Sequence, residues 1–345
     1  MESDASFDSL EYRNDHETRI YSRSLEAYQI IKVIGKGLMG KVMLVREKIS
    51  GRLFAMKSIN KEQLHSQSNS AHLWDERKVL LNHPSSPFLI IMYAAFQTDT
   101  HLFFLLEYHP GGDFASILGS LYRLSEDAAR FYAAEILLGL KALHKGGVVY
   151  RDLKPENVLL DRRGHVVLTD FGLSKPDAKH LLLRTFCGTA EYLAPEILQG
   201  QPYDFAVDLW SFGTMVYEML LGVVPFWCEN ATEMYHRIVH DQAIPFPDIH
   251  TTDSAKDLIR KLLEKSPQKR LTDIEEIQKH TFFTGIDWCR AEKKQLEPPF
   301  IPNLQHEEDV SAFEPQFVRM STTLSPTPQK APDGVSFRGF SFAVN

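Results

Sequence analysis

The stretch IGKGLMGKVMLVR, residues 34–46, contains two overlapping glycine patterns that occur in phosphate-binding loops. Gly35, Gly37 and Gly40 give GxGxxG, and residues 35–41 also give GxxxxGK. Whether a strand or a helix follows the glycines distinguishes the classes of protein in which such loops occur. The run VMLVR continues directly after Lys41, so we expect the loop to join two strands rather than a strand and a helix.

Two loops that open a helix fit this stretch poorly. A dinucleotide-binding loop places the pyrophosphate at the N-terminus of the next helix, and a P-loop makes the same strand-to-helix turn. The P-loop also needs a serine or threonine after its lysine to bind magnesium, and Val42 stands there. The remaining order is strand, glycine loop, strand and then a lysine on the next strand, in Ala55-Met56-Lys57. That is the order of a protein kinase.

Three further motifs occur in kinase order: YRDLKPEN at 150–157, DFG at 170–172 and APE at 194–196. With them, residues 28–283 resemble a eukaryotic protein kinase. The wording of YRDLKPEN, the run TFCGTAEYLAPE at 185–196 and a phenylalanine-rich tail resemble the AGC group, which includes protein kinases A, B and C and the SGK-like branch. The resemblance implies an α+β, bilobal protein kinase fold. It has a small antiparallel β-sheet lobe with helix C, a larger mainly α-helical lobe and a C-terminal tail.

The composition limits the classes of partner and the cellular compartment that we expect. The formal charge of the 345 residues is 38 − 45 = −7, which gives no global basic field for nucleic acid or an anionic membrane. No apolar run approaches the roughly 18 residues of a membrane span, so we expect no membrane insertion. The three cysteines lie far apart, which indicates neither a disulfide framework nor a zinc site. We expect a cytoplasmic location, with the nucleus as an additional one.

The chain divides into four parts by composition and resemblance. Residues 1–27 are an acidic tail without periodicity, which predicts flexibility. Residues 28–107 form the expected small lobe, and residues 108–283 the expected helical lobe. Residues 284–345 correspond to the AGC tail.

Periodicity places the expected elements within these parts. β-branched runs predict an antiparallel meander at 28–35, 41–48 and 53–59. A helical pattern covers Ala71 to Leu81, and two more strands are predicted at 88–97 and 101–108. Ser125 is expected to cap a long amphipathic helix.

The resemblance implies that the glycine loop, the lysine strand and the hinge bind ATP. Glu76 is the expected partner of the Lys57 ammonium. Asp75 is its competitor, since only one of two adjacent helix positions can face inward. Leu106 takes the gatekeeper position at the end of a strand, and the hinge backbone would bind adenine. The residues implied are Ile34, Gly35, Lys36, Gly37, Leu38, Met39, Gly40, Lys41, Val42, Ala55, Lys57, Glu76, Leu106, Glu107 and Tyr108.

The resemblance also implies the catalytic set. Asp152 would accept or orient the proton of the substrate hydroxyl, and Lys154 would neutralise charge on the transferring phosphoryl group. Asn157 and Asp170 would present oxygens to Mg²⁺, which prefers hard ligands. Two structural groups are also implied, a buried ion pair of Glu196 with Arg270 and an aspartate, Asp208, that fixes the catalytic loop.

Regulation is implied by the activation loop and the tail. Thr185 matches the activation-loop phosphothreonine, with Arg151 and Lys175 as its expected cationic partners; without a phosphate, Arg151 has no obvious partner. FRGFSF at 337–342 resembles the AGC hydrophobic motif with Ser341 as its phosphosite, and its aromatic side chains are expected to dock on the small lobe near helix C. Ser325 and Thr327 are alternative turn-motif sites, and residues 313–317 resemble the segment that brings a phenylalanine near the adenine pocket. Upstream kinases acting on Thr185 and Ser341 are the implied partners.

Three acids fall where related kinases bind arginines of the substrate: Asp113, Glu156 and Glu218. They predict basic protein substrates of the RxRxxS/T kind, although Asp113 could equally be a helix N-cap. The rival hypothesis is a pseudokinase scaffold, which is disfavoured because Lys57 and the catalytic set are all present. One departure from the family pattern is Leu38-Met39 where many AGC members have Ser-Phe, from which we expect a working lid with altered nucleotide affinity.

Overall fold

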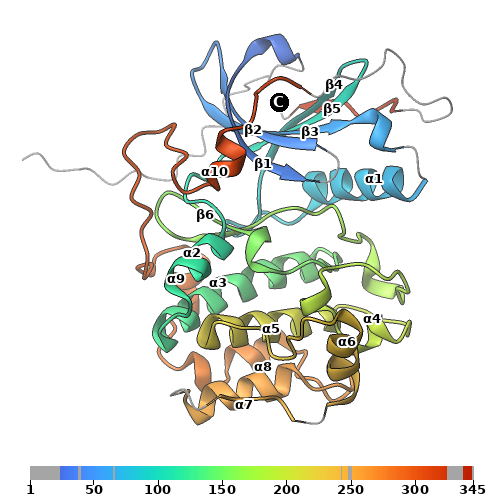
Figure 1. Ribbon diagram of the computed structural model, residues 1–345, viewed down its shortest axis with the longest axis vertical. Helices are drawn as coiled ribbons and strands as arrows, with labels where there is room; N and C mark the ends of the chain where they lie inside the picture. Colours follow the sequence, from blue (N-terminus) through green and yellow to red (C-terminus); the bar gives the residue numbers. More distant parts are fainter. Residues whose placement is uncertain are drawn as a thin grey trace, which may run out of the picture.

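A computed structural model describes residues 24–37, 40–64, 67–241, 243–247, 251–324 and 337–343. Leu38, Met39, Ser325 and Thr327, and most of the expected acidic tail, lie outside the described residues. The described chain forms two stacked lobes. The upper lobe consists of a sheet and one long helix, and the lower lobe is mainly helical (Figure 1). This is the predicted α+β, bilobal arrangement.

A six-stranded sheet, in the order β1-β2-β3-β5-β4-β8, makes up the small lobe. The predicted meander of β1 to β3 is confirmed, with Val42 of β2 paired to Lys57 of β3. Lys57 is paired on its other side with Phe104 of β5. The strands are β1 Tyr28–Gly37, β2 Gly40–Glu47, β3 Leu53–Asn60, β4 Met92–Gln97, β5 His101–Glu107 and β8 Phe342–Ala343.

The last strand of this sheet, β8, comes from the C-terminal tail. Ala343 pairs with Ala94 and Phe342 with Ala95, antiparallel, so the tail covers the edge of β4. A two-residue strand has no detectable alternation, which is why the sequence did not predict it. The docking of the tail's aromatic residues was predicted and is confirmed, since Phe337 and Phe340 are buried.

The helix of the small lobe, α1, spans Gln67–Asn82 and contains the predicted segment, which began four residues too late. The strand predicted at 88–97 begins only at Met92. The residues before it instead bind the large lobe, because the Ile90 amide donates to the Leu168 carbonyl at 3.0 Å and the Leu168 amide to that of Phe88 at 2.8 Å. This segment therefore ties the two lobes together.

Helices build the large lobe around a small sheet of β6 and β7. Ser125 caps α3 as predicted, its hydroxyl accepting from the Ala128 amide at 3.3 Å. The elements are α2 Phe114–Leu121, α3 Glu126–Lys145, β6 Val158–Leu160, β7 Val166–Leu168, α4 Pro195–Leu198, α5 Ala206–Leu221, α6 Ala231–His240, α7 Asp253–Leu262, α8 Ile274–Gln278 and α9 Trp288–Glu292. Within the described ranges, no helix combines the length and apolar character needed to cross a membrane.

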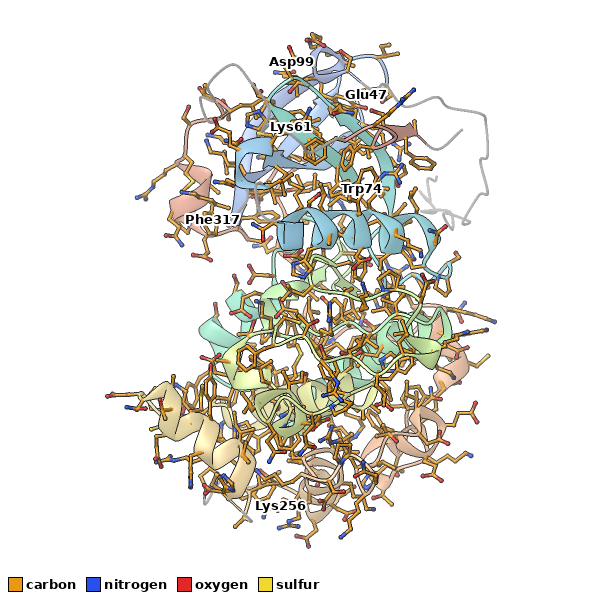
Figure 2. All side chains as sticks on the ribbon, turned by 90° about the vertical axis from the view of Figure 1, so that its right-hand side faces the viewer. Glu47, Lys61, Trp74, Asp99, Lys256 and Phe317 are labelled. Carbon is orange, nitrogen blue, oxygen red and sulfur yellow. The ribbon has the colours of Figure 1, made fainter. Side chains whose placement is uncertain are left out.

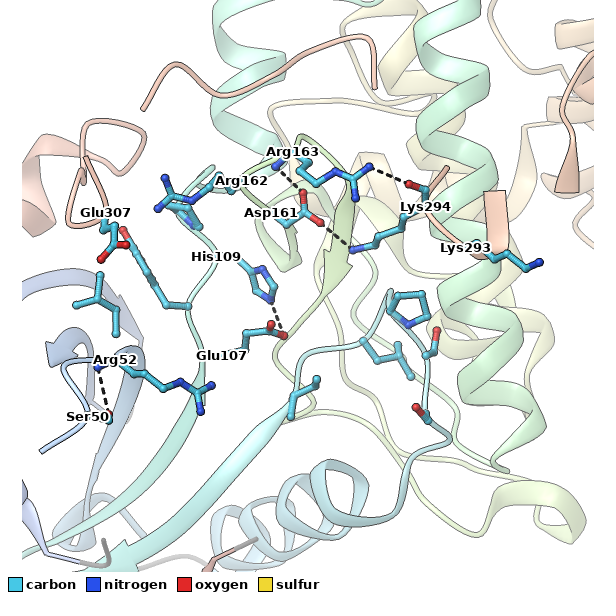
Figure 3. Close-up of a pocket in the computed structure, with 18 of the residues that line it drawn as sticks. Ser50, Arg52, Glu107, His109, Asp161, Arg162, Arg163, Lys293, Lys294 and Glu307 are labelled. Carbon is cyan, nitrogen blue, oxygen red and sulfur yellow. Dashed lines mark hydrogen bonds and ion pairs between the residues drawn. The ribbon is translucent and has the colours of Figure 1, made fainter. Parts of the chain in front are cut away.

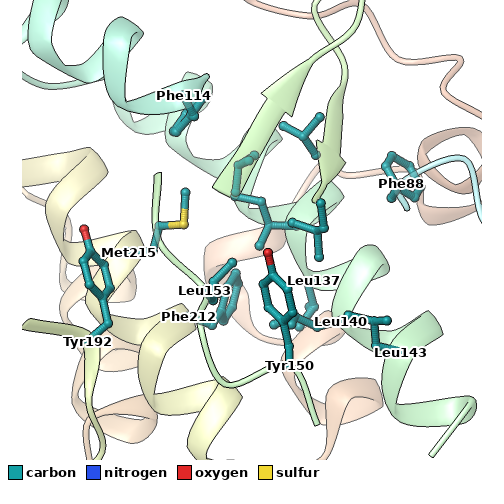
Figure 4. Close-up of a cluster of buried hydrophobic side chains, with 14 of the residues drawn as sticks. Phe88, Phe114, Leu137, Leu140, Leu143, Tyr150, Leu153, Tyr192, Phe212 and Met215 are labelled. Atoms are coloured by element: carbon teal, nitrogen blue, oxygen red, sulfur yellow. The ribbon is translucent and has the colours of Figure 1, made fainter. Parts of the chain in front are cut away.

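The core of the large lobe lies directly beneath the catalytic loop. Leu137, Leu140 and Leu143 project from α3 toward Tyr150 and Leu153 (Figure 4), and all five are buried. The loop that follows Tyr150 is thus anchored at its base by packed apolar side chains. This limits the freedom of the residues it carries.

The tail runs back from the large lobe to the small one. Its short helix α10, Pro315–Val318, lies against β1 (Figure 1). The tail contacts the small lobe in two places (Figure 2). Phe317 of α10 packs against the core of the sheet, and Phe340 of the tail contacts Trp74 of α1. The tail therefore contacts the small lobe at both its cleft side and its α1 side.

Candidate active site

A cleft of about 590 Å³ lies between the two lobes and collects most of the predicted site residues. It is bordered by the glycine loop, β3, α1, the hinge, the catalytic loop, the DFG segment and the tail. The predicted residues that line it are Ile34, Gly35, Lys36, Gly37, Gly40, Lys41, Val42, Ala55, Lys57, Glu76, Leu106, Glu107, Tyr108, Asp113, Asp152, Glu156, Asn157 and Asp170. Thr185, Lys154, Arg151, Lys175 and Glu218 are not among its lining residues.

Of the three glycines of the loop, Gly40 has the strictest steric requirement. A Cβ at Gly40 would overlap the carbonyl oxygen of Ser58 on β3, whereas one at Gly37 would meet nothing within 4 Å. The close approach of β2 to β3 therefore requires glycine at position 40.

Lys57 extends from β3 into an ion-pair triad. Its Nζ lies 2.7 Å from Glu76 Oε1 and 2.9 Å from Asp170 Oδ1. Burial lowers the pKa of Lys57, but the charges of Asp170 and Glu76 raise it by more, so the net pKa lies above the usual value. The Lys57 charge in turn lowers the pKa of Asp170, while burial raises that of Glu76. The lysine is therefore held as a cation facing the cleft.

The predicted choice of Glu76 over Asp75 is confirmed. Glu76 is buried and faces Lys57, while Asp75, one position earlier on α1, faces out and pairs with Lys175 at 2.8 Å. The ion pair between Asp75 and Lys175 was not predicted. It binds Lys175 to helix α1.

Asp152 is held by three neighbours, two from its own YRDLKPEN segment and one from the TFCGTAEYLAPE run. Its Oδ2 accepts from Asn157 Nδ2 at 2.8 Å and lies 3.2 Å from Lys154 Nζ. Its Oδ1 accepts from the Thr189 hydroxyl at 2.8 Å, and that hydroxyl accepts from Lys154 Nζ at 2.8 Å. Thr189 was missed from sequence, although it lies inside the TFCGTAEYLAPE run. Its hydroxyl links the carboxylate and the ammonium of the site.

The comparisons with known proteins agree with this geometry. The protein kinase domain family matches residues 28–283, and the protein kinase C terminal domain family matches residues 304–342. The chain is 42% identical over 330 residues to the RAC family serine/threonine-protein kinase homolog of Dictyostelium discoideum, covering 92% of this chain and 72% of that protein. It is 43% identical over 334 residues to the serine/threonine-protein kinase Sgk1 of Homo sapiens, covering 92% and 76%.

The chain belongs to the AGC group of serine/threonine protein kinases. ATP is therefore its phosphoryl donor, and family members generally need Mg²⁺.

The kinase fixes its catalytic loop through Asp208, as predicted. Asp208 is fully buried and accepts from the backbone amides of Tyr150 and Arg151 at 2.9 and 2.8 Å, and His144 Nε2 lies 2.8 Å from it. Arg151 has φ of 68°, in the left-handed region that non-glycine residues rarely adopt. The carboxylate of Asp208 thus stabilises a strained turn immediately before Asp152.

The buried ion pair predicted for the kinase is also present. Arg270 Nη1 and Nη2 lie 2.7 and 2.9 Å from the two carboxylate oxygens of Glu196, a bidentate arrangement. Both side chains are excluded from solvent. The pair joins the APE segment to the chain after α7.

The hinge of the kinase is covered by its own tail, as predicted for residues 313–317. The ring of Tyr108 stacks on Phe313 with centroids 6.1 Å apart, and its hydroxyl donates to the Asp309 carbonyl at 3.0 Å. Phe313 and Phe317 both line the cleft. His109, the residue after the predicted hinge segment, lines the cleft as well and was missed.

Lys41 lines the cleft as predicted, but its ammonium is bound by the tail. Its Nζ donates to the carbonyls of Ser321 and Thr323 at 3.0 and 2.9 Å. Sequence spacing cannot predict this contact, because its partners lie about 280 residues away. The tail is thereby joined to the strand after the glycine loop.

The expectation that Arg151 lacks a partner without a phosphate is wrong. Its Nε donates to the Leu173 carbonyl at 2.6 Å and its Nη1 to the Tyr203 hydroxyl at 3.2 Å. The Tyr203 hydroxyl donates to the Thr185 carbonyl at 2.8 Å, so Arg151 reaches Thr185 through one intervening side chain. Thr185 itself is exposed.

The three acids predicted for arginine recognition fall into two places. Asp113 is indeed the N-cap of α2, with Oδ1 accepting from the Ser116 amide at 2.8 Å, and it still lines the cleft. Glu218 accepts from the Tyr192 hydroxyl, and burial, together with the charge of Glu156, raises its pKa. Glu156 lines the cleft with Asp113, and its charge also acts on Glu218, so it lies near both places.

The donor set suits a magnesium ion. Asn157 uses its amide nitrogen toward Asp152, which leaves its amide oxygen as an acceptor, and Asp170 is ionised beside Lys57. Carboxylate and amide oxygens are the ligands that Mg²⁺ prefers, and it usually takes only one or two carboxylates alongside phosphate oxygens. Within the described part of the chain, no cluster of three or more His, Cys, Asp or Glu is arranged for a metal.

Proposed function

We propose that Asp152 is the group that orients and accepts the proton of the substrate hydroxyl during phosphoryl transfer. The observation that supports this is its threefold restraint by Asn157, Lys154 and Thr189, which holds the carboxylate in one position at the floor of the cleft. Phosphoryl transfer depends mainly on such positioning and on charge neutralisation. Lys154 and Lys57 supply positive charge for the phosphates.

Asn157 and Asp170 would hold Mg²⁺, which when bound neutralises charge on the phosphate oxygens. Lys57 keeps Asp170 ionised and so maintains it as an oxygen ligand.

The test of this assignment is a peptide phosphorylation assay with Mg-ATP, comparing the wild type with Asp152→Asn. We expect Asp152→Asn to lose nearly all phosphate incorporation while binding nucleotide as the wild type does. Equal incorporation by the two proteins would contradict the assignment, and a scaffold would be favoured if neither protein exceeded the background without enzyme.

The substrates proposed are serine or threonine residues preceded by arginines, as in RxRxxS/T. The support is the group of acids at the mouth of the cleft, Asp113 and Glu156, with Glu218 close to Glu156. Arginine binds carboxylates in a bidentate manner, so paired acids discriminate arginine from neutral side chains.

A peptide series tests this specificity. Replacing each arginine of an RxRxxS peptide by alanine should raise the KM of the wild type, and the same replacement should have a smaller effect on Glu156→Gln. If Glu156→Gln and the wild type respond equally at every position, the assignment of this acid is wrong.

Activation is proposed to require phosphate on Thr185 and on Ser341. Thr185 and Ser341 are both exposed and so accessible to an upstream kinase. A phosphate adds about −1.5 to −2 charges, and at Thr185 it would compete with Asp75 for Lys175 and attract Arg151, whose guanidinium is one side chain away. Comparing kcat of the unmodified kinase with that of forms phosphorylated at one or both sites tests this; a kcat independent of both phosphates would overturn it.

A further inference from the structure

A second cavity, larger than the nucleotide cleft, lies against the hinge and has a volume of about 1140 Å³ (Figure 3). We call it the hinge-side cavity; it is formed by residues 50–53, 85–87, 89, 91, 107–110, 161–163, 293–295 and 307. Three hinge residues, Glu107, Tyr108 and His109, line both this cavity and the cleft. None of the residues that hold or position the catalytic carboxylate and the magnesium ligands lines it.

The charge of the hinge-side cavity is opposite to that of the chain. Five cations line it against three acids, 5 − 3 = +2, although the whole chain carries −7. The cations are Arg52, Arg162, Arg163, Lys293 and Lys294, and the acids are Glu107, Asp161 and Glu307. A local excess of positive charge on an acidic protein favours an anionic ligand.

Part of this charge is already used to build the wall. Lys294 is buried and lies 3.0 Å from Asp161 Oδ2, and Arg163 Nη2 donates to the Lys294 carbonyl at 3.2 Å (Figure 3). Arg162 and Lys293 are exposed, and neither has a carboxylate within 4.0 Å among the described residues. These two cations are therefore available to a ligand.

The walls between the charges are apolar. Leu53, Leu89 and Ile91 line the cavity together with prolines of the hinge and of the segment before β4. A ligand that fits would combine carboxylates with apolar side chains, which describes an acidic peptide better than a free inorganic anion.

The chain itself enters the structure beside this cavity. The Lys48 amide donates to the Ala27 carbonyl at 2.9 Å, and Lys48 Nζ donates to the Glu26 carbonyl at 2.7 Å. Lys48 stands two residues before Ser50, the first residue of the cavity rim. Glu26 and Ala27, close to the first described residue, therefore lie near the rim of the cavity.

We propose that residues 2–12, ESDASFDSLEY, bind the hinge-side cavity of the same chain. The segment has four acids and no lysine or arginine, interspersed with Phe7, Leu10 and Tyr12. Residues 13–23 separate it from Ser24, and an extended chain of that length spans up to about 40 Å. Its carboxylates pair with Arg162 and Lys293, and its apolar side chains lie on the walls of the cavity.

Site-specific photo-crosslinking in the full chain tests the proposal. A photoreactive amino acid at position 10, in place of Leu10, should form intramolecular crosslinks that mass spectrometry maps to residues 50–53, 85–91, 161–163 or 293–295. Raising sodium chloride to about 1 M, where the Debye length is about 3 Å, should reduce the yield.

Charge reversal supplies the matched control. Arg162→Glu/Lys293→Glu should reduce these crosslinks about fivefold or more, because like charges then face each other. Lys269→Glu/Lys279→Glu makes the same change of net charge at exposed positions outside the cavity and should leave them unchanged. Crosslinks mapping elsewhere, crosslinks between isotopically distinct copies, or equal yields from both double variants would each overturn the proposal.

Discussion

Thr189 donates its hydroxyl hydrogen to the carboxylate of Asp152 over 2.8 Å and accepts from Lys154 over the same distance. We predict that Thr189→Ala lowers kcat on the order of 10- to 100-fold, because the carboxylate loses one of its restraints and small displacements at a reacting centre are costly. Thr189→Ser keeps the hydroxyl and should retain most of the activity. Peptide kinetics check this, and an alanine variant with the wild-type kcat would contradict it.

Removing one partner of the buried ion pair between Arg270 and Glu196 should lower the free energy of unfolding far more than removing one partner of an exposed pair. Removing one partner with Glu196→Ala leaves the guanidinium buried and uncompensated, which should lower the free energy of unfolding by about 3 to 5 kcal/mol. Glu233→Ala removes the partner of Arg237 in an exposed pair on α6 and should cost less than about 1 kcal/mol. Denaturant titrations of the two variants measure both values, and similar losses would refute the distinction.

Lys265 gives a prediction for the pH dependence of stability. Burial lowers its pKa from 10.5 to about 8, and its ammonium sits 4.0 Å from the centre of the Phe226 ring. Between pH 8 and 10.5 the unfolded chain binds more protons at this lysine than the folded one, so stability rises with pH there. Because the side chain is only partly buried, solvent screening keeps the slope below the limit of about 1.4 kcal/mol per pH unit.

The comparison with Lys265→Met isolates this contribution. The free energy of unfolding of the wild type, minus that of Lys265→Met, should increase as the pH is raised through this window. A flat difference would show that the pKa of Lys265 is not lowered.

Particular residues show which parts of the fold and the site could be predicted from the sequence. Lys57, Glu76 and Asp152 were predictable because short motifs on successive elements place them, and the meander of β1 to β3 follows from local patterning. Thr189, the Lys175 pair to Asp75 and the binding of Lys41 by Ser321 depend on where distant segments meet. No local periodicity encodes such contacts. The strand β8 was missed for a different reason, since it is too short to have a pattern.

The docked tail should control helix α1. Phe340 is fully buried, its ring lies 6.0 Å from Trp74 of α1 and 5.3 Å from Phe104, and its carbonyl accepts from Arg77 at 2.8 Å. Because α1 carries Glu76, we predict that Phe340→Ala lowers kcat/KM by about fivefold or more, as is typical of coupled sites. Hydrogen exchange in α1 and at the edge of β4 should become faster. Protection equal to that of the wild type in Phe340→Ala would exclude the coupling.

The stacking of Phe313 on Tyr108 predicts that the tail contributes to nucleotide affinity. Phe313 lines the cleft and contacts the hinge, and the tail beyond it is joined to Lys41 next to the glycine loop. Removing the ring with Phe313→Ala should raise the KM for ATP several-fold with a smaller change in kcat, since the ring stacks on the hinge and its binding contribution is lost equally in the ground and transition states. Phe313→Tyr keeps the stacking and should behave like the wild type. Initial rates at varied ATP separate the two constants. If kcat fell while the KM for ATP stayed constant, the tail would act on the chemical step and the proposed role at the nucleotide would be wrong.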